Sequence, residues 1–443
     1  MNIIVSGIYI ALIAVFAFRK DYTNLIVLMV LSLLGNMFYF DFYGSRIQAY
    51  QLIPLSVIFF DKVFYKVLLN NIIREIRYEY ILLLLTGFLF GYLIPWDIGD
   101  SERTWSQLPE GRTIVALIRI ALEINIIYFV YFVFVNDLVE INELLNIISF
   151  FVIFIVLVAI VDAIIGYPIY KHIFNVGSYF ERMSGRLLGF SHEPRGFART
   201  LEAMVMLLFI SYINGYQFKF RNTSVIVGML GVLLSFSFSS YILLGVSFVY
   251  LYKSEIFKAR SLFIFMGVVI IGFIFYYMVK DNPKIALITS RYDMVTEGRE
   301  EYLMEGENVL FTRFELFDRA ALNFFSDNPQ HLLIGTGPNL IGIPSSKYMD
   351  KSAIVTFQGQ LSGIPGIGLV NLLSRSGIIG LLLYLLFYFK ISHKLKKLSN
   401  KYLGDIFTIS FITYLLVQNP IFFFAIGFVL SEMGKNISDQ DNI

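Results

Sequence analysis

The chain has 443 residues, of which 57% are apolar and only 15% are charged, and its mean hydropathy is +0.70. Soluble domains are about one-quarter charged, so this composition predicts an integral membrane protein. The net charge of +2 is too small to indicate a nucleic-acid partner, and the lack of cysteine excludes disulfides and thiolate chemistry. The apolar runs are continuous rather than alternating, which is typical of membrane helices.

Apolar runs of about 17–25 residues predict helices that cross a hydrocarbon core about 30 Å thick. A last apolar stretch, 405–432, is interrupted at Asn419-Pro420, where proline removes a backbone donor, so it forms either one kinked span or two short ones. The prediction is an all-α polytopic membrane protein with a bundle of about 12 (11–13) transmembrane helices. The other spans are placed near 2–18, 24–41, 47–61, 79–95, 113–135, 144–167, 195–213, 222–237, 239–252, 261–279 and 366–389.

Lysine and arginine are concentrated in alternate connections, which by the positive-inside rule face the cytoplasm. Only the connection Asn136–Glu143 in this series lacks a basic residue. The other series, which includes 96–112, 168–194 and 280–365, then faces outward, and the N-terminus lies outside. The basic connections hold Arg19-Lys20, Lys62 to Arg77, Lys219 to Arg221, Lys253 to Arg260 and Lys394 to Lys401.

The predicted order divides the chain into three parts. Residues 1–279 hold the first ten helices and an arginine-rich outer loop, 168–199, and residues 366–443 hold the C-terminal helices. Between them, 280–365 form a long outer segment with an amphipathic helix over 312–326, which a capping box opens and Asp327-Asn328-Pro329 closes. A connection of this length in a compact protein usually carries a function. The apolar face of its helix is expected on the membrane surface or on the outer mouth of the bundle.

The loop 168–199 gathers four arginines beside a histidine and a glutamate. A spacing of four places two arginines on one helical face, and Pro194 suits the first turn of a helix whose positive dipole end points outward. Guanidinium groups and free backbone amides suit a diphosphate ligand. The alternative is that these arginines are interfacial anchors for lipid headgroups. The residues concerned are Arg182, Arg186, His192, Glu193, Arg195 and Arg199.

Further charges occur inside predicted spans. Glu123 follows Arg119 by one turn as an expected ion partner, and Glu202 follows Arg199 in the same manner. Arg375 lies two to three turns inside the span 366–389. Intramembrane charges of this kind either face a cavity or pair with one another to fix the packing of helices.

The chemistry expected at this mouth is proton transfer and charge stabilisation. Neither Glu193 nor His192 has a metal-site spacing around it, and each could take a proton from an attacking hydroxyl, with Glu193 as the preferred base. Arg313 and Arg319 on the helix 312–326 would lie close to the same mouth. No motif of a metal hydrolase, serine hydrolase or phosphate-binding loop is present, so the sequence predicts no metal and no cofactor.

Three segments resemble the bacterial O-antigen polymerase and ligase superfamily of membrane glycosyltransferases. They are Arg182–Ala198, similar to the block ahead of a central helix; Thr312–Asn339, similar to the long outer loop; and Asn371–Leu382, similar to the helix after that loop. The Glu193-Pro194 pair and Arg375 are more similar to the polymerase branch. The ligase branch commonly has a histidine before the last of these helices, where this chain reads GIPGIG over 363–368.

The resemblance implies a GT-C-like, metal-independent glycosyltransferase in the bacterial inner membrane, with its active site facing the periplasm. It would move a growing glycan from undecaprenyl diphosphate to a lipid-linked repeat unit. Its expected partners are that lipid-linked oligosaccharide, membrane lipids and a chain-length regulator protein. The alternatives are a ligase acting on lipid A core or another acceptor, and a transporter or flippase, which predicts a symmetry between halves that the sequence lacks. Glu193, His192 and Arg195 would be catalytic, and the substrate would be bound by Arg119, Arg182, Arg186, Arg199, Arg313, Arg319 and Arg375.

Overall fold

The fold is a helical bundle with one small hairpin. The computed structural model describes residues 3–34, 39–42, 45–64, 109–165, 187–191, 194–235, 237–253, 316–337, 340–349, 365–398 and 400–441. In the hairpin, the antiparallel strands β1 (Tyr39–Phe42) and β2 (Ser45–Gln48) pair Tyr39 with Gln48 and Phe42 with Ser45. The described helices are α1 (Ile3–Arg19), α2 (Tyr22–Leu34), α3 (Ala49–Phe60), α6 (Pro109–Val135), α7 (Ile141–Ile165), α9 (Pro194–Ile213), α10 (Arg221–Leu234), α11 (Phe238–Leu251), α14 (Leu316–Asp327), α15 (Pro329–Ile334), the 3-10 helix η5 (Pro344–Tyr348), α17 (Gly368–Lys397), α18 (Lys401–Val417) and α19 (Ile421–Asp441).

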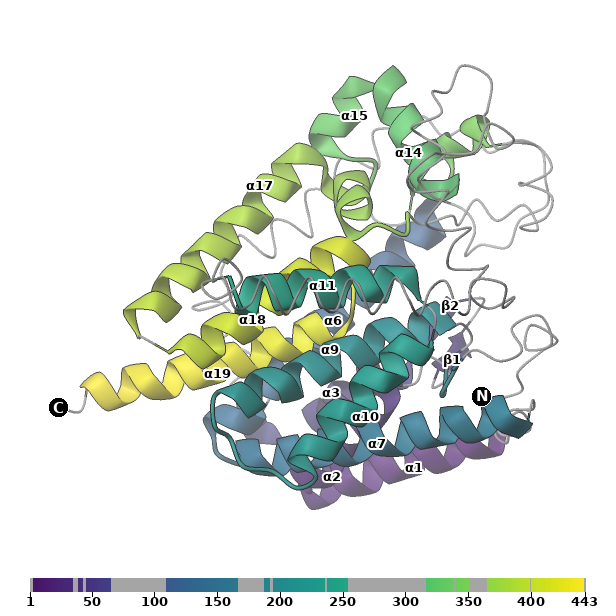
Figure 1. Ribbon diagram of the computed structural model, residues 1–443. Coiled ribbons are helices and arrows are strands. Elements are labelled where there is room, and N and C mark those ends of the chain that lie inside the picture. Colours follow the sequence, from purple (N-terminus) through teal and green to yellow (C-terminus); the bar gives the residue numbers. More distant parts are fainter. Residues whose placement is uncertain are drawn as a thin grey trace, which may run out of the picture.

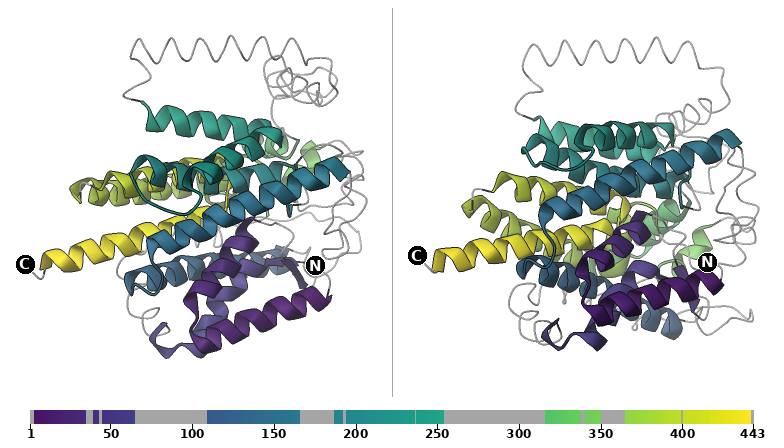
Figure 2. Two further views of the ribbon diagram at one scale, coloured as in Figure 1. Left: turned by 60° about the horizontal axis from the view of Figure 1, so that its bottom comes forward. Right: turned by 90° about the horizontal axis from the view of Figure 1, so that it is seen from below.

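Most of these helices lie side by side, with α14 and α15 set together at the outer part of the bundle (Figure 1). In both views of Figure 2, the N-terminus and the far end of α19 lie at opposite ends of the molecule. Buried apolar side chains form a continuous core across the bundle, with members such as Leu25 of α2, Phe129 of α6, Val205 of α9 and Phe428 of α19. A helical bundle satisfies its backbone hydrogen bonds internally, as a hydrocarbon environment requires.

Glycine allows some of these helices to approach very closely. A Cβ atom at Gly427 of α19 would lie 2.5 Å from the carbonyl oxygen of Ile127 in α6, and one at Gly231 of α10 would lie 2.6 Å from a methyl group of Val156 in α7. Small residues at helix contacts are typical of membrane bundles, because packing rather than water exclusion holds the helices together.

Four described helices are long and apolar enough to cross a membrane: Thr113–Val135, Ile141–Ile165, Arg195–Ile213 and Gly368–Lys397. Five shorter helices are also apolar: Val5–Arg19, Tyr22–Leu34, Ala49–Phe60, Arg221–Leu234 and Ser239–Leu251. These helices define a helical membrane protein, as the composition predicts. The expected total of about 12 spans stays a prediction, because the predicted spans 79–95 and 261–279 lie outside the described residues.

Several predicted spans have different bounds in the structure, and three of the differences are informative. The span 24–41 is wrong at its end, because α2 stops at Leu34 and residues 39–42 form β1. Gly35 and Asn36 are poor helix formers, and the aromatic stretch after them favours a strand. Of the two alternatives for the stretch 405–432, the structure shows two helices, α18 and α19, which together extend from Lys401 to Asp441. Finally, α17 continues to Lys397, beyond the predicted end at 389.

The connections predicted to be cytoplasmic meet at one end of the bundle, which we call the basic end and define by Lys20, Asp137, Lys219 and Lys435. Lys20 Nζ lies 3.3 Å from a carboxylate oxygen of Asp61, which joins the ends of α1 and α3. The backbone N–H of Lys219 donates to a side chain of the first turns of α7, and Lys435 Nζ lies 2.5 Å from a carboxylate oxygen of Asp137. Ring contacts of Phe132 with Tyr22 and Phe64 link these two groups of contacts.

Candidate functional site

The break between α18 and α19 connects three helices at the end opposite the basic end. Asn371 Nδ2 of α17 donates to Gln418 Oε1 at 2.6 Å, and Asn419 Nδ2 donates to the backbone carbonyl of Arg199 in α9 at 2.8 Å. Asn419 Oδ1 also accepts from the backbone N–H of Ile421 at 3.0 Å. Asn419 is only 4% exposed, and both the N–H donor and the oxygen acceptor of its side-chain amide are hydrogen-bonded. The break places the starts of α9, α17 and α19 beside one another.

A cluster of polar side chains adjoins this break, and two guanidinium groups share one carboxylate in it. Glu123 of α6 interacts electrostatically with Arg119 and Arg375, and Arg375 lies within hydrogen-bonding reach of the Tyr414 hydroxyl. Tyr50 of α3 lies close enough to interact with both Arg119 and Glu123. We call this set (Tyr50, Arg119, Glu123, Arg375 and Tyr414) the arginine–glutamate cluster.

The two tyrosines of the cluster are buried, whereas its three charged side chains are partly exposed. Burying charge in a membrane protein costs several kcal/mol by insertion scales, so such groups pair with one another or line a polar site. The cluster carries a formal charge of +1, and guanidinium forks match the paired oxygens of phosphate groups. It is therefore suited to an anionic ligand.

Arg195 and Arg199 start α9 on the other side of the break. Both are partly buried, and Arg199 Nε donates to the hydroxyl of Ser239 in α11 at 3.4 Å. The expected ion pair of Arg199 with Glu202 is wrong. Glu202 is completely buried, faces Ser247, and makes no well-formed hydrogen bond within the described part of the chain. The two side chains have separate partners, because Arg199 contacts Ser239 and Glu202 faces Ser247, both in α11.

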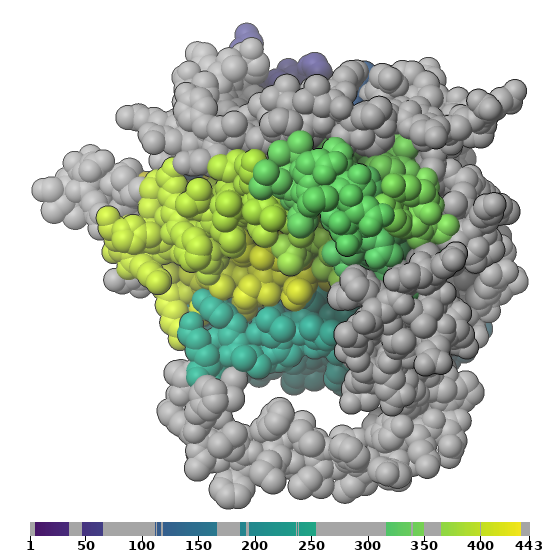
Figure 3. All heavy atoms as spheres, turned by 90° about the horizontal axis from the view of Figure 1, so that it is seen from above, coloured from purple at the N-terminus to yellow at the C-terminus, as the bar shows by residue number. Residues whose placement is uncertain are grey.

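The helix α14 docks on the start of α17. Asp318 Oδ1 accepts from the backbone N–H of Ile367 at 3.0 Å, at the N-terminus of α17, where the helix dipole favours a carboxylate. Behind it, Ala321, Phe324 and Phe325 pack against Ile341 and Val370 in a small separate core. The apolar face of α14 therefore packs on the bundle, against η5 and the start of α17. Figure 3 shows the green surface of this region against the yellow-green surface of α17.

A path of hydrogen bonds connects α14 to α9. Asp318 accepts from the N–H of Ile367, and the carbonyl of Ile367 accepts from the N–H of Asn371. The Asn371 side chain donates to Gln418, and the next residue, Asn419, donates to the carbonyl of Arg199. Arg319, which is 6% exposed, follows Asp318 directly. The predicted site residues of α9, α14 and α17 are thus tied to one end of the bundle, which we call the arginine end.

Five of the predicted site residues are described: Arg119, Arg195, Arg199, Arg319 and Arg375. The structure brings Arg119 and Arg375 into one cluster, and the hydrogen-bonded path ends at the Arg199 carbonyl and at Asp318, the residue before Arg319. The side chains of Arg182, Arg186, His192, Glu193 and Arg313 lie outside the described residues, so their predicted roles stay predictions.

The sequence analysis did not identify several residues that build this end. Tyr50 and Tyr414 look like ordinary apolar helix positions, and Asp318 looks like a solvated residue of the first turn of α14. The break gave a signal, because an Asn-Pro pair inside an apolar run requires partners for freed backbone groups. Gln418 and Asn419 could have been predicted on that basis.

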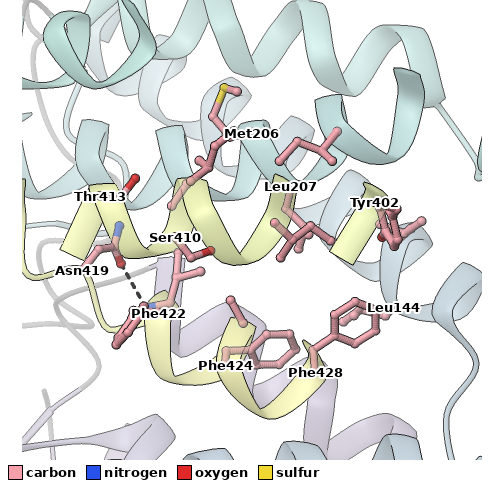
Figure 4. A pocket seen from close by; sticks show the side chains of 17 residues that line it. Leu144, Met206, Leu207, Tyr402, Ser410, Thr413, Asn419, Phe422, Phe424 and Phe428 are labelled. Atoms are coloured by element: carbon pink, nitrogen blue, oxygen red, sulfur yellow. Dashed lines mark hydrogen bonds between the residues drawn. The ribbon is translucent and has the colours of Figure 1, made fainter. Parts of the chain in front are cut away.

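An apolar pocket lies behind the break, between α7, α9, α18 and α19 (Figure 4). Its lining is almost wholly hydrocarbon and aromatic, with Met206 and Leu207 on one side and Phe424 and Phe428 on the other. Ser410, Thr413 and Asn419 supply the polar groups at the end toward the break. Asn419 therefore separates the polar arginine end from an apolar interior.

His331 of α15 lies beside α14, with its ring stacked on Phe324 at a centroid distance of 5.4 Å. Burial lowers the pKa of His331 below its usual value of 6.5, and a backbone hydrogen bond at Gly335 acts in the opposite direction. The neutral imidazole is therefore the form that this packing favours.

No known protein family matches the chain, and no curated protein matches its sequence. The fold defines a helical membrane protein that gathers arginines at one end. Its activity is therefore argued from the site itself.

Proposed function

We propose that the chain is a membrane glycosyltransferase that moves a glycan from a polyprenyl diphosphate to a hydroxyl group of a second lipid-linked saccharide. The observation that carries this proposal is the pairing of Arg119 and Arg375 with Glu123 beside the break at 418–420, which also binds the backbone carbonyl of Arg199 at the start of α9. A lipid-linked donor can enter such a bundle sideways from the bilayer. Its diphosphate would then meet guanidinium groups at the arginine end.

In the proposed reaction, the acceptor oxygen forms a bond to the anomeric carbon as the bond from that carbon to the diphosphate oxygen breaks. The bonding electrons leave with the diphosphate, and the arginines stabilise the negative charge that grows on it. The acceptor hydroxyl loses its proton to a general base, for which Glu193 is the proposed group and His192 the second candidate. Arg195, Arg182, Arg186 and Arg313 are proposed to complete the diphosphate site with Arg319.

The polymerase branch of the resembling superfamily is the proposed identity, and a periplasmic face of the bacterial inner membrane is the proposed location. Two features support it: the segments around Arg195 and Arg375 resemble that superfamily, and α14 docks on α17. The two alternatives differ in products. A ligase would join the glycan to lipid A core or another acceptor, and a flippase would change only the membrane side on which the substrate lies.

The test is purified protein in proteoliposomes that contain a lipid-linked repeat unit, with products separated by chain length. We expect a ladder of longer glycans from the wild type and none from Arg195→Ala, Arg313→Ala or Arg375→Ala. Arg221→Ala is the matched control, because this arginine lies near the basic end, over the ring of Tyr212 at 4.2 Å. A normal ladder from the first three variants, or movement of substrate without elongation, would refute the proposal.

A further inference from the structure

The helix α17 is interrupted close to Arg375. Gly377 has φ of 64° and ψ of −165°, outside the helical region, so the chain changes direction between two helical segments (Figure 1). In an uninterrupted helix, the carbonyl of Ser374 would accept from the N–H four residues later. The break removes that partner, and a buried carbonyl without a partner is costly. Ser374 itself is 1% exposed, so another group must supply the hydrogen bond.

The residues after α15 supply that bond. The backbone N–H of Thr336 donates to the Ser374 carbonyl at 2.8 Å, and its hydroxyl donates to the same oxygen at 2.9 Å. Thr336 is fully buried. The long outer segment, seen in sequence as separate from the helices, therefore completes the hydrogen bonding of α17 with both donors of one residue.

The two backbones meet so closely that each needs glycine. A Cβ atom at Gly335, which has φ of 81°, would lie 2.6 Å from the backbone nitrogen of Ser376 and 2.7 Å from the carbonyl carbon of Arg375. A Cβ atom at Gly377 would overlap the backbone carbonyl of Leu333. A backbone cannot move aside as a flexible side chain can, so residues 333–336 fit this break in one arrangement only.

We propose that residues Leu333–Thr336 are a positioning element for Arg375. By filling the break, they fix the direction in which α17 presents Arg375 to Glu123 and Tyr414. The docking of α14 through Asp318 holds the same segment at the N-terminus of α17, so the described outer helices and the first turns of α17 form one packed unit. The claim that this unit matters for diphosphate binding rests on the proposed function, whereas the positioning of Arg375 is argued from geometry alone.

The first experiment measures the geometry, and the cysteine-free chain makes it direct. Spin labels are attached at Leu333→Cys and Leu386→Cys, positions whose side chains are 50% and 59% exposed on α15 and on α17 beyond the break. We expect one narrow distance distribution in the parent and a shifted or broadened one with Gly377→Ala or Gly335→Ala. Gly404→Ala and Gly215→Ala are the controls, since a Cβ atom at either position meets nothing within 4 Å, and Gly215 shares the positive φ. An unchanged distribution in the two test variants overturns the inference.

The second experiment separates positioning from simple packing. Thr336→Val keeps the shape and the backbone hydrogen bond and removes only the hydroxyl, so it is expected to fold. We expect it to weaken the affinity for farnesyl diphosphate by about tenfold and to have no further effect in an Arg375→Ala background. Equal weakening in both backgrounds would mean that Thr336 does not act through Arg375, which overturns the inference.

Wild-type protein that binds no farnesyl diphosphate would contradict the proposed function and not the positioning. In that case the same double-mutant cycle of Thr336→Val and Arg375→Ala is measured as changes in melting temperature. A smaller loss from Thr336→Val in the Arg375→Ala background than in the wild type supports the positioning, and additive losses overturn it.

Discussion

Glu123 is the single carboxylate that faces both Arg119 and Arg375 in the arginine–glutamate cluster. At this scale, the structure shows why a charge can persist inside an apolar helix. Its cost is offset by two cations from different helices, and losing it would leave those cations facing each other. The cluster therefore links side chains of α6 and α17 and contributes to the charge of the arginine end.

Glu123→Gln is accordingly expected to lower the melting temperature of the purified protein. The loss should be about 1–3 kcal/mol of unfolding free energy, because the charged groups are partly exposed and water screens their repulsion. Arg375→Ala should then cost less in the Glu123→Gln background than in the wild type. Thermal unfolding of the four proteins measures this, and equal costs in both backgrounds would show that the two side chains do not interact.

His331 predicts how stability depends on pH. Burial lowers its pKa in the folded state, so the unfolded chain binds a proton more readily. Stability from this residue is therefore complete above the usual value of 6.5 and is lost as the pH falls below that value toward the folded pKa. We expect the melting temperature to drop from pH 8 to pH 5 and to drop less in His331→Gln. A wild type and a variant with the same pH profile would contradict this account.

Among elements, the break between α18 and α19 has the largest structural effect. An Asn-Pro pair stops one helix and starts the next, and the freed groups bind α17 and α9. The break was predicted from sequence, and so were the starts of α9 and α17, because Pro194 and a glycine-rich approach mark them. The partners across helices were not, since a hydrogen bond over 220 residues of chain leaves no local pattern.

Asn419→Ala tests this role. The substitution removes both the hydrogen bond to the Arg199 carbonyl and the cap on the Ile421 N–H. We therefore expect the free energy of unfolding to fall by about 2 kcal/mol or more. Asn400→Ala is the matched control, because Asn400 only caps α18 through the Leu403 N–H at 3.1 Å and should cost about 1 kcal/mol. Thermal or denaturant unfolding compares the two variants. Equal losses would show that the link to α9 contributes nothing.

At the scale of the whole molecule, the sequence predicted the class of fold because composition and run length determine it. It predicted Arg119 and Arg375 as site residues from the cost of intramembrane charge, and Arg199 from the arginine-rich loop 168–199. It could not assign Arg119 and Arg375 to one cluster, nor show that Arg199 pairs with Ser239 of α11, because such contacts are set by the packing of neighbouring helices. The hairpin β1–β2 was missed, since an apolar aromatic stretch beside a span has no distinct pattern.

The two ends of the bundle predict a sidedness that single cysteines can measure. In a chain without native cysteine, Lys219→Cys and Lys394→Cys should react with a membrane-impermeant maleimide only after cells are permeabilised. Lys347→Cys, in η5 beside α14, should react in intact cells. Labelling of all three in intact cells, or the reverse pattern, would contradict the predicted orientation.

The salt bridge from Lys435 to Asp137 has a consequence for how the protein is made. The turn after α6 is the only member of its series without a positive residue, so during synthesis nothing in that turn retains it on its side of the bilayer. Its counter-ion arrives nearly 300 residues later along the chain, when α19 inserts. A nascent chain would thus hold its middle hairpin without this ion pair until α19 has inserted.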